Sequence, residues 1–250
     1  MTLPRLLVLT DRRQCQRPLV DTVAAAVQGG ARGVVLREKD LPLDERLRLA
    51  ERLRAVLDPV EGLLVLAGAV PGAAAVHLAA ADRLPDERPA LVGRSCHDVA
   101  QVLAASEEGC DYVTVSPVFL TASKPGYGPA LGLDGLAGLV RAAPGLPLVA
   151  LGGIDPHTAA ACRAAGAAAV AVMGAVMRAE HPDREVARLI AALDGDCGPV
   201  REGDCGPLPG GSRRPVARGD DGGRPGTTKA QVEDLGLAAG SLRSCSGGRI

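Results

Sequence analysis

Short apolar runs alternate with amphipathic segments over the first 193 residues of the chain. Eight runs rich in Val, Leu and Ala predict buried strands at 6–9, 33–36, 63–66, 76–78, 91–93, 112–115, 147–151 and 169–172. Apolar residues at three- and four-residue spacing predict helices at 19–28, 44–57, 99–108, 134–142 and 157–165. Strand–helix alternation favours parallel pairing, and eight units favour closure into an α/β fold, the (β/α)8 TIM barrel.

Two of the eight units are short. Only residues 67–75 separate the third strand from the fourth, and residues 79–90 separate the fourth from the fifth. A crossover helix barely fits in such segments, so we expect turns there. The main alternative is an open, doubly wound sheet. The sequence argues against a dinucleotide-binding sheet of this kind. Its first strand leads into Thr10-Asp-Arg-Arg13 and not into a Gly-x-Gly-x-x-Gly turn.

The pattern stops near residue 193, which divides the chain into a barrel domain (1–193) and a second segment (194–250). The second segment is dense in Gly, Pro and Arg, and it contains Gly-Asp-Cys-Gly-Pro twice, at 195–199 and 203–207. Such a composition cannot bury enough apolar surface to offset the entropy lost on ordering. We therefore expect a disordered C-terminal tail.

Composition narrows the class of protein. The apolar share of 47% is carried almost wholly by Ala, Val and Leu, which suits parallel strands buried on both faces. The net charge of −1 predicts no nucleic acid partner and no anionic membrane surface. No apolar run is long enough to span a bilayer or to form a signal peptide, so we expect a cytoplasmic protein. Seven scattered cysteines predict free thiols.

All three aromatic residues of the chain, Tyr112, Phe119 and Tyr127, fall in one short segment. The same segment holds Lys124, one of only three lysines in a chain that otherwise uses arginine. A lysine within Thr121-Ala-Ser-Lys-Pro-Gly offers a compact charge on a flexible stem, beside two hydroxyl groups. This loop is therefore a candidate phosphate-binding segment.

Polar residues follow several predicted strands, where the loops of a parallel barrel form the active face. Arg37 and Lys39 follow the second strand and share one direction, because side chains alternate along a strand. Ser95, His97 and Asp98 follow the fifth strand, too close in sequence to form a hydrolase triad and without a nucleophile elbow. We expect Asp98 to cap the next helix and Ser95 to donate to a phosphoryl oxygen.

Glycines follow the last two strands. Gly152 and Gly153 come after the seventh strand, and Met173 and Gly174 after the eighth. Glycines at these positions let backbone N–H groups approach an anion, which is the recurring phosphate site of this fold. The sequence thus predicts a second phosphate site.

Six short motifs occur in order between about residues 6 and 190. They are Leu36-Arg-Glu-Lys-Asp40, His77-Leu-x3-Asp82-x-Leu-Pro85, Gly93-x-Ser95-x-His97, Asp111-Tyr-Val with Pro117-Val-Phe-x-Thr121-x-Ser-Lys-Pro125, Ala150-Leu-Gly-Gly-Ile154 and Val170-Ala-Val-Met173. Together they resemble the motifs of the thiamine phosphate synthase family and of its close relative, the thiazole tautomerases.

The resemblance implies a transferase of thiamine biosynthesis that joins hydroxymethylpyrimidine diphosphate to thiazole phosphate and releases pyrophosphate. By position, the pyrimidine diphosphate would contact Arg37, Lys39, Ser95 and Lys124, of which Ser95 and Lys124 would be catalytic. The thiazole phosphate would contact Thr121, Ser123, Gly152, Gly153, Met173 and Gly174. Asp82 would hold Mg²⁺. The implied partners are phosphorylated thiamine precursors, and the sequence leaves a homo-oligomer open.

The chain also departs from these motifs. The synthase pattern has Gln where this chain has Val35, and Asn-Asp-Arg where it has Ala67-Gly68-Ala69. A pyrimidine-binding amide and, at Gly68, the second acidic metal ligand are therefore absent. The tautomerases place a catalytic histidine just before Val-Phe, where this chain has Ser116-Pro117.

Three hypotheses follow from the resemblance and the departures. The first is a synthase-like transferase, which includes a form weakened by the missing amide and carboxylate. The alternatives are a thiazole phosphate tautomerase, which is an isomerase, and a non-catalytic paralogue that binds thiazole or thiamine phosphate.

Overall fold

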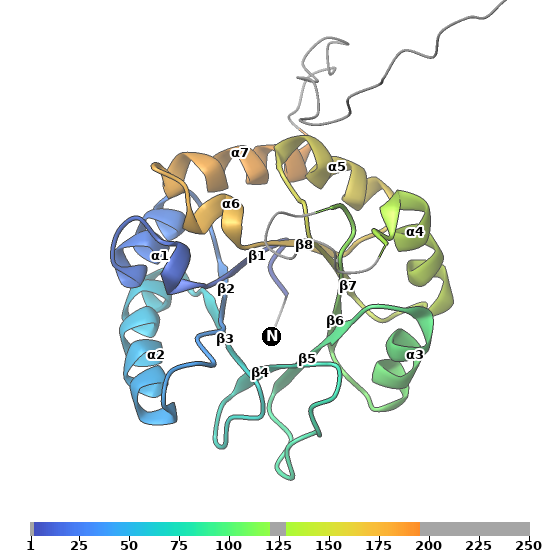
Figure 1. Ribbon diagram of the computed structural model, residues 1–250, viewed down its shortest axis with the longest axis horizontal. Helices are drawn as coiled ribbons and strands as arrows, with labels where there is room; N and C mark the ends of the chain where they lie inside the picture. The colour runs from blue at the N-terminus through green and yellow to red at the C-terminus, as the bar shows by residue number, and fades with distance from the viewer. Residues whose placement is uncertain (1–2, 121–128, 196–250) are drawn as a thin grey trace, which may run out of the picture. The chain divides into compact units, whose positions relative to one another are not determined.

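The structure of the protein, a computed structural model, describes residues 3–120 and 129–195. Eight parallel strands form a closed barrel in the order β1 to β8 (Figure 1). They are β1 (Leu6–Leu9), β2 (Gly33–Leu36), β3 (Leu63–Ala67), β4 (Ala75–Leu78), β5 (Leu91–Cys96), β6 (Tyr112–Val115), β7 (Leu148–Leu151) and β8 (Ala169–Val172). The predicted (β/α)8 TIM barrel is confirmed.

The helices lie outside the barrel. They are α1 (Leu19–Gln28), α2 (Leu43–Leu57), α3 (Val99–Glu107), α4 (Gly132–Ala142), α5 (Pro156–Ala164), α6 (Gly174–Met177) and α7 (Pro182–Asp194), with 3-10 turns η1 (Arg12–Gln14) and η2 (Asp58–Val60). The helices α6 and α7 add to the five that periodicity predicts. Helix α7 begins at a proline and ends at Asp194, and the next residue, Gly195, has a left-handed backbone that suits glycine.

The ring of helices is open on one side. No helix occurs in the described segments between β3 and β4 or between β4 and β5, where Figure 1 shows only loops. Turns replace the helices there, as the short segments predict. This gap matters for the site because the loops beside it carry Asp82.

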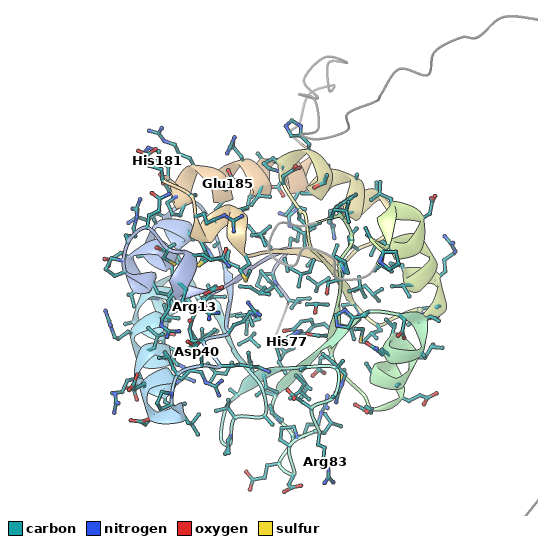
Figure 2. All side chains as sticks on the ribbon, in the orientation of Figure 1. Arg13, Asp40, His77, Arg83, His181 and Glu185 are labelled. Carbon is teal, nitrogen blue, oxygen red and sulfur yellow. The ribbon has the colours of Figure 1, made fainter. Side chains whose placement is uncertain are left out.

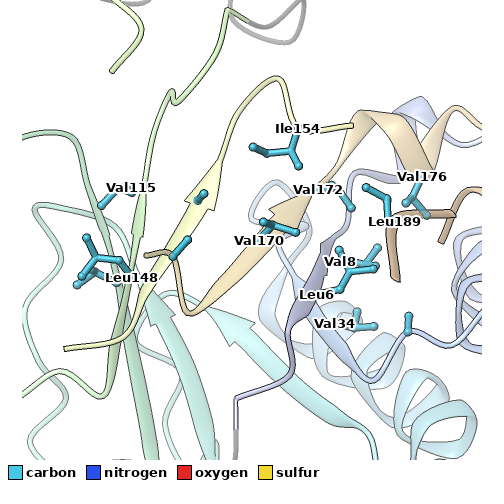
Figure 3. Packing of buried hydrophobic residues seen from close by; sticks show 14 of the residues in the cluster. Leu6, Val8, Val34, Val115, Leu148, Ile154, Val170, Val172, Val176 and Leu189 are labelled. Atoms are coloured by element: carbon cyan, nitrogen blue, oxygen red, sulfur yellow. The ribbon is translucent and has the colours of Figure 1, made fainter. Parts of the chain in front are cut away.

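The core has two layers because side chains alternate along each strand. Leu7 and Leu9 point into the barrel and pack with Tyr112 of β6. Leu6 and Val8 point outward and pack against the helices, as Figure 3 shows beside Leu189 of α7. Small aliphatic side chains thus fill both layers, and the carboxyl ends of the strands remain for the site.

Strand β5 is longer than the apolar pattern indicates. Its pairing with β6 continues through Ser95↔Thr114 and Cys96↔Val115. The prediction that Ser95 follows the strand is therefore wrong: Ser95 lies within β5. The polar residues Arg94 and Ser95 hid this extension, because the parallel hydrogen-bond ladder does not depend on apolar side chains.

Two further predictions concern the whole chain. The cysteines that the structure describes, Cys15, Cys96, Cys110 and Cys162, are free thiols. None of the described helices is long and apolar enough to cross a bilayer. Thr121, Ser123 and Lys124 lie outside the described residues, as does the predicted tail beyond residue 195.

Candidate active site

A cavity of about 1070 Å³ opens at the carboxyl ends of the strands. Most of the predicted site residues line it: Arg37, Lys39, Ser95, Gly152, Gly153, Met173 and Gly174. Asp82 lines a neighbouring cavity of about 540 Å³, which shares Lys39 and Ala67 with the larger one. The structure thus brings the described members of both predicted phosphate-binding sets to one cavity, with Asp82 in the cavity beside it.

Charged side chains at the end of β2 separate into two sets. Arg37 donates from Nη1 to Met173 Sδ at 2.8 Å, so its guanidinium reaches across to β8. Glu38 is buried and Asp40 exposed, and both accept hydrogen bonds from the Arg12 guanidinium at 2.8–2.9 Å. Arg12 offsets one of the two negative charges, and Arg37 and Lys39 then leave this edge of the cavity with one positive charge in excess.

Lys39 extends in another direction, toward the loop after β4. Its Nζ lies 3.5 Å from Asp82 Oδ2, which also accepts a hydrogen bond from the Ala79 N–H at 2.8 Å. The Ala79 hydrogen bond, and to a smaller extent Lys39, lowers the pKa of Asp82, so this carboxylate is ionised at neutral pH. Arg37 and Lys39 both line the cavity, but their charged ends lie at different walls.

Gly68 stands at the position where the synthase motif has its second acidic metal ligand. Gly68 follows β3 with φ +88°, a backbone that favours glycine. A Cβ atom on Gly68 would lie 3.8 Å from Lys39 Cε and 3.9 Å from Nζ. Among the described residues, no group of three His, Cys, Asp or Glu side chains is placed to hold a metal ion. A Mg²⁺ ion beside Asp82 would therefore depend on substrate phosphate oxygens and water for most of its ligands, since the Asp82 carboxylate already pairs with Lys39.

The floor of the cavity is a hydrogen-bonded cluster around His77, which lies inside the ring of strands in Figure 2. His77 Nδ1 is 3.1 Å from the Tyr112 hydroxyl, and His77 Nε2 is 3.0 Å from Ser95 Oγ and 3.3 Å from Thr114 Oγ1. Sequence reasoning did not find this cluster. The four residues point inward from β4, β5 and β6, so strand register could have suggested it.

The His77 ring is neutral. Burial, aided by the nearby Lys39 and Arg37 charges, lowers its pKa to about 3. A neutral imidazole donates from one nitrogen and accepts at the other, and a buried phenol O–H needs an acceptor. We therefore assign Tyr112 as donor to Nδ1, and Nε2–H as donor to Ser95. The Ser95 hydroxyl hydrogen is then free to point into the cavity.

The segment after Ser95 does not form a hydrolase triad. His97 Nδ1 contacts the Ser116 backbone oxygen at 2.8 Å. Asp98 accepts a hydrogen bond from the Gln101 N–H at 2.8 Å and caps α3, as predicted. Ser95 therefore has His77, and not His97, as its imidazole partner.

The glycine pair after β7 permits a close approach of the loop that follows β6. Gly152 and Gly153 have φ values of +100° and +65°. A Cβ atom on Gly153 would lie 2.7 Å from the Leu120 oxygen, closer than real contacts allow. The Phe119 N–H donates to the Gly152 oxygen at 3.0 Å, which fixes the two loops together. The pair therefore has a structural requirement in addition to its predicted phosphate role.

Two cations that the sequence patterns missed also line the cavity, Arg13 and Arg178. The Arg178 guanidinium packs directly over Gly174, where a Cβ atom would overlap it. It also donates to Gln14 Oε1 from the η1 turn. A signal existed, because Arg178 stands one helical turn after Gly174.

Comparison with known proteins agrees with this geometry. The thiamine monophosphate synthase family profile matches residues 6–176. A putative thiamine-phosphate synthase of Geobacter sulfurreducens is 38% identical over 200 residues, covering 75% of this chain and 93% of that protein. A thiamine-phosphate synthase of Roseiflexus sp. is 34% identical over 198 residues, covering 74% and 84%.

A solved structure gives the same result. Thiamine phosphate pyrophosphorylase from Pyrococcus furiosus superposes with a TM-score of 0.65 at 28% identity, covering 78% of this chain and 97% of that one. The family profile spans more than half of this chain, and both sequence relatives exceed 30% identity over most of their length. The chain belongs to the thiamine monophosphate synthase family.

Proposed function

We propose that this protein is a thiamine phosphate synthase, a transferase that joins hydroxymethylpyrimidine diphosphate to thiazole phosphate. The observation that supports the proposal is the large cavity, which gathers described residues from both sets that are predicted to bind phosphate. Arg37, Lys39 and Ser95 form one set, and the backbone at Gly153 and Gly174 belongs to the other. A volume of about 1070 Å³ accommodates two small substrates side by side.

The reaction requires mainly charge stabilisation and alignment. The bond between the pyrimidine methylene carbon and the diphosphate oxygen breaks, and its electron pair leaves with the diphosphate. The lone pair of the thiazole nitrogen then forms the new C–N bond. Arg37, Lys39 and Ser95 donate hydrogen bonds to the departing oxygens, which stabilises the charge that develops there. Holding both substrates in one cavity supplies the alignment.

The remaining predicted contacts complete this site as part of the proposal. Thr121 and Ser123 would bind the thiazole phosphate, and Lys124 would bind the leaving group, from a segment outside the described residues. We expect Lys124→Ala to abolish turnover, while Arg141→Ala, at an exposed position on α4, retains it. Steady-state rates of thiamine phosphate formation measure both. Unchanged activity in Lys124→Ala would remove this lysine from the site.

The central experiment gives purified full-length protein both substrates, with Mg²⁺ and separately with EDTA. We expect thiamine phosphate as product, detected after separation and oxidation to its fluorescent derivative. No product under either condition, with thiazole phosphate binding intact, would contradict the proposal. Conversion of thiazole phosphate alone to an isomer would favour the tautomerase, for which His97 supplies an imidazole that lines the cavity.

A further inference from the structure

The Lys39 side chain fills the space between the end of β3 and Asp82. Its Cε and Nζ atoms lie 3.8 Å and 3.9 Å from where a Gly68 side chain would begin. Its ammonium group is 3.5 Å from Asp82 Oδ2. A Cβ atom at position 68 would be in ordinary van der Waals contact with the end of this lysine. The ammonium group thus lies between position 68 and the Asp82 carboxylate.

The lining of the smaller cavity is rich in charged side chains. Lys39, Arg46 and Arg83 line it together with Asp82 and Asp86. Arg46 Nε is buried and has no hydrogen-bond partner among the described residues. Three cations, Lys39 among them, against two carboxylates leave one positive charge in excess, which favours an anion over a cation at this wall.

The Lys39 ammonium group also has enough N–H donors to bind Asp82 and a ligand at the same time. An ammonium group has three N–H donors, and Asp82 accepts from one side only. Lys39 also lines the large cavity, so its remaining donors are available to a ligand there. Asp82 is thus a positioning residue, because it orients the ammonium group and does not need to contact the substrate.

We propose that Lys39 supplies the charge neutralisation of the leaving diphosphate at the wall where a divalent cation would otherwise bind, so that this site binds pyrophosphate without metal. The inference rests on the proposed function for its ligand. When the carbon–oxygen bond breaks, the electron pair passes to the diphosphate, and the Lys39 N–H groups hydrogen-bond the oxygens that gain charge.

Calorimetric titration of inorganic pyrophosphate into the full-length protein tests this directly. We expect binding in EDTA, with an affinity that added Mg²⁺ improves by less than about tenfold once the Mg²⁺–pyrophosphate equilibrium is included. Lys39→Gln should weaken metal-free binding roughly ten- to hundredfold, as expected for loss of a charged hydrogen bond. Arg48→Gln, which removes an exposed charge from α2, is the matched control and should bind like the wild type.

Two outcomes would overturn the inference: pyrophosphate binding that requires Mg²⁺, or metal-free binding that survives Lys39→Gln unchanged. Both differ from a failure of the proposed function. Metal-free pyrophosphate binding without any thiamine phosphate formation would refute the synthase and leave the Lys39 site intact. Product formation that requires Mg²⁺ would support the synthase and refute the metal-free site.

Discussion

His77 illustrates how position alone determines the chemistry of a side chain. An exposed histidine titrates within the physiological range, but His77 is buried among Tyr112, Ser95 and Thr114 and near two cations. Its pKa of about 3 keeps it neutral, so it acts as a fixed donor and acceptor between Tyr112 and Ser95 and not as an acid. In the proposed reaction, His77 would therefore orient the Ser95 hydroxyl.

The depressed pKa of His77 predicts an acid-sensitive fold. Between its ordinary value of 6.5 and about 3, the unfolded chain binds a proton that the native protein excludes. Keeping His77 neutral therefore costs no stability above pH 6.5. Below that pH, the free energy of unfolding falls as the pH decreases through this window. Urea unfolding at a series of pH values should show a steeper acid slope for the wild type than for His77→Gln.

The control for this measurement is His157→Gln, at an exposed position on α5, which should follow the wild-type pH dependence. The slope, and not the absolute stability, is the informative quantity, because His77→Gln also changes packing. Equal acid slopes in the wild type and His77→Gln would show that His77 is not held neutral.

The position of Arg178 leads to a second prediction, which concerns the binding of thiazole phosphate. Its guanidinium lies over Gly174, beside the backbone that is proposed to bind the thiazole phosphate. We expect Arg178→Gln to weaken binding of thiazole phosphate roughly tenfold, since one charge-assisted hydrogen bond is lost. Equilibrium titration measures this, with Arg184→Gln on α7 as the charge-matched control. An unaltered affinity in Arg178→Gln would exclude a phosphate contact.

At the scale of elements, Arg94 compensates for the helix that is absent between β4 and β5. Its side chain points outward from β5 and is 5% exposed. Its Nη1 donates to the backbone oxygens of Ala79, Ala80 and Asp82 at 3.1, 3.2 and 2.8 Å, while Nη2 pairs with Glu108 at 2.7 Å. One guanidinium thus holds the loop that positions Asp82 beside Lys39.

Replacing Arg94 should therefore destabilise the loop after β4. Lysine lacks the forked donors, so Arg94→Lys leaves buried carbonyl groups without partners and should cost about 2–4 kcal/mol of unfolding free energy. Arg88→Lys disturbs a half-exposed pair with Asp111 and should cost less than about 1 kcal/mol. Denaturant unfolding compares the two, and equal losses would refute the special role of Arg94.

Element type and order could be predicted from the sequence because periodicity reports burial, and burial determines these strands. The loops between β3 and β5 were predictable from length alone. The contacts of Arg94 with the loop after β4, and of Arg178 with Gln14, were not, because each joins segments that no periodic pattern relates. The length of β5 was missed for a similar reason: its final residues pair through the backbone, which leaves no apolar signature.

At the scale of the whole molecule, the packing of the barrel interior depends on one aromatic ring. Tyr112 is fully buried, and its ring lies against Gly93 of the neighbouring strand. The absence of a side chain at Gly93 makes room for this ring among small aliphatic residues. The His77 cluster rests on it, so the packing of the barrel interior and the floor of the cavity depend on the same contact.

A methyl group at Gly93 should disturb the barrel as a unit. In Gly93→Ala the new Cβ would overlap the Tyr112 ring, and overpacking of this kind costs about 1–3 kcal/mol. Gly138→Ala on α4 meets nothing within 4 Å and should be neutral or slightly stabilising. Thermal unfolding distinguishes the variants; a Gly93→Ala protein as stable as Gly138→Ala would contradict this packing.

The position of Tyr112 also gives the protein an optical reporter of its own. The chain has no tryptophan and only two tyrosines, so its near-ultraviolet absorbance comes from very few rings. One of them lies beneath the cavity, bonded to His77. A ligand that enters above this pair changes the polarity around the phenol, and a difference spectrum records that change without a dye or an engineered label.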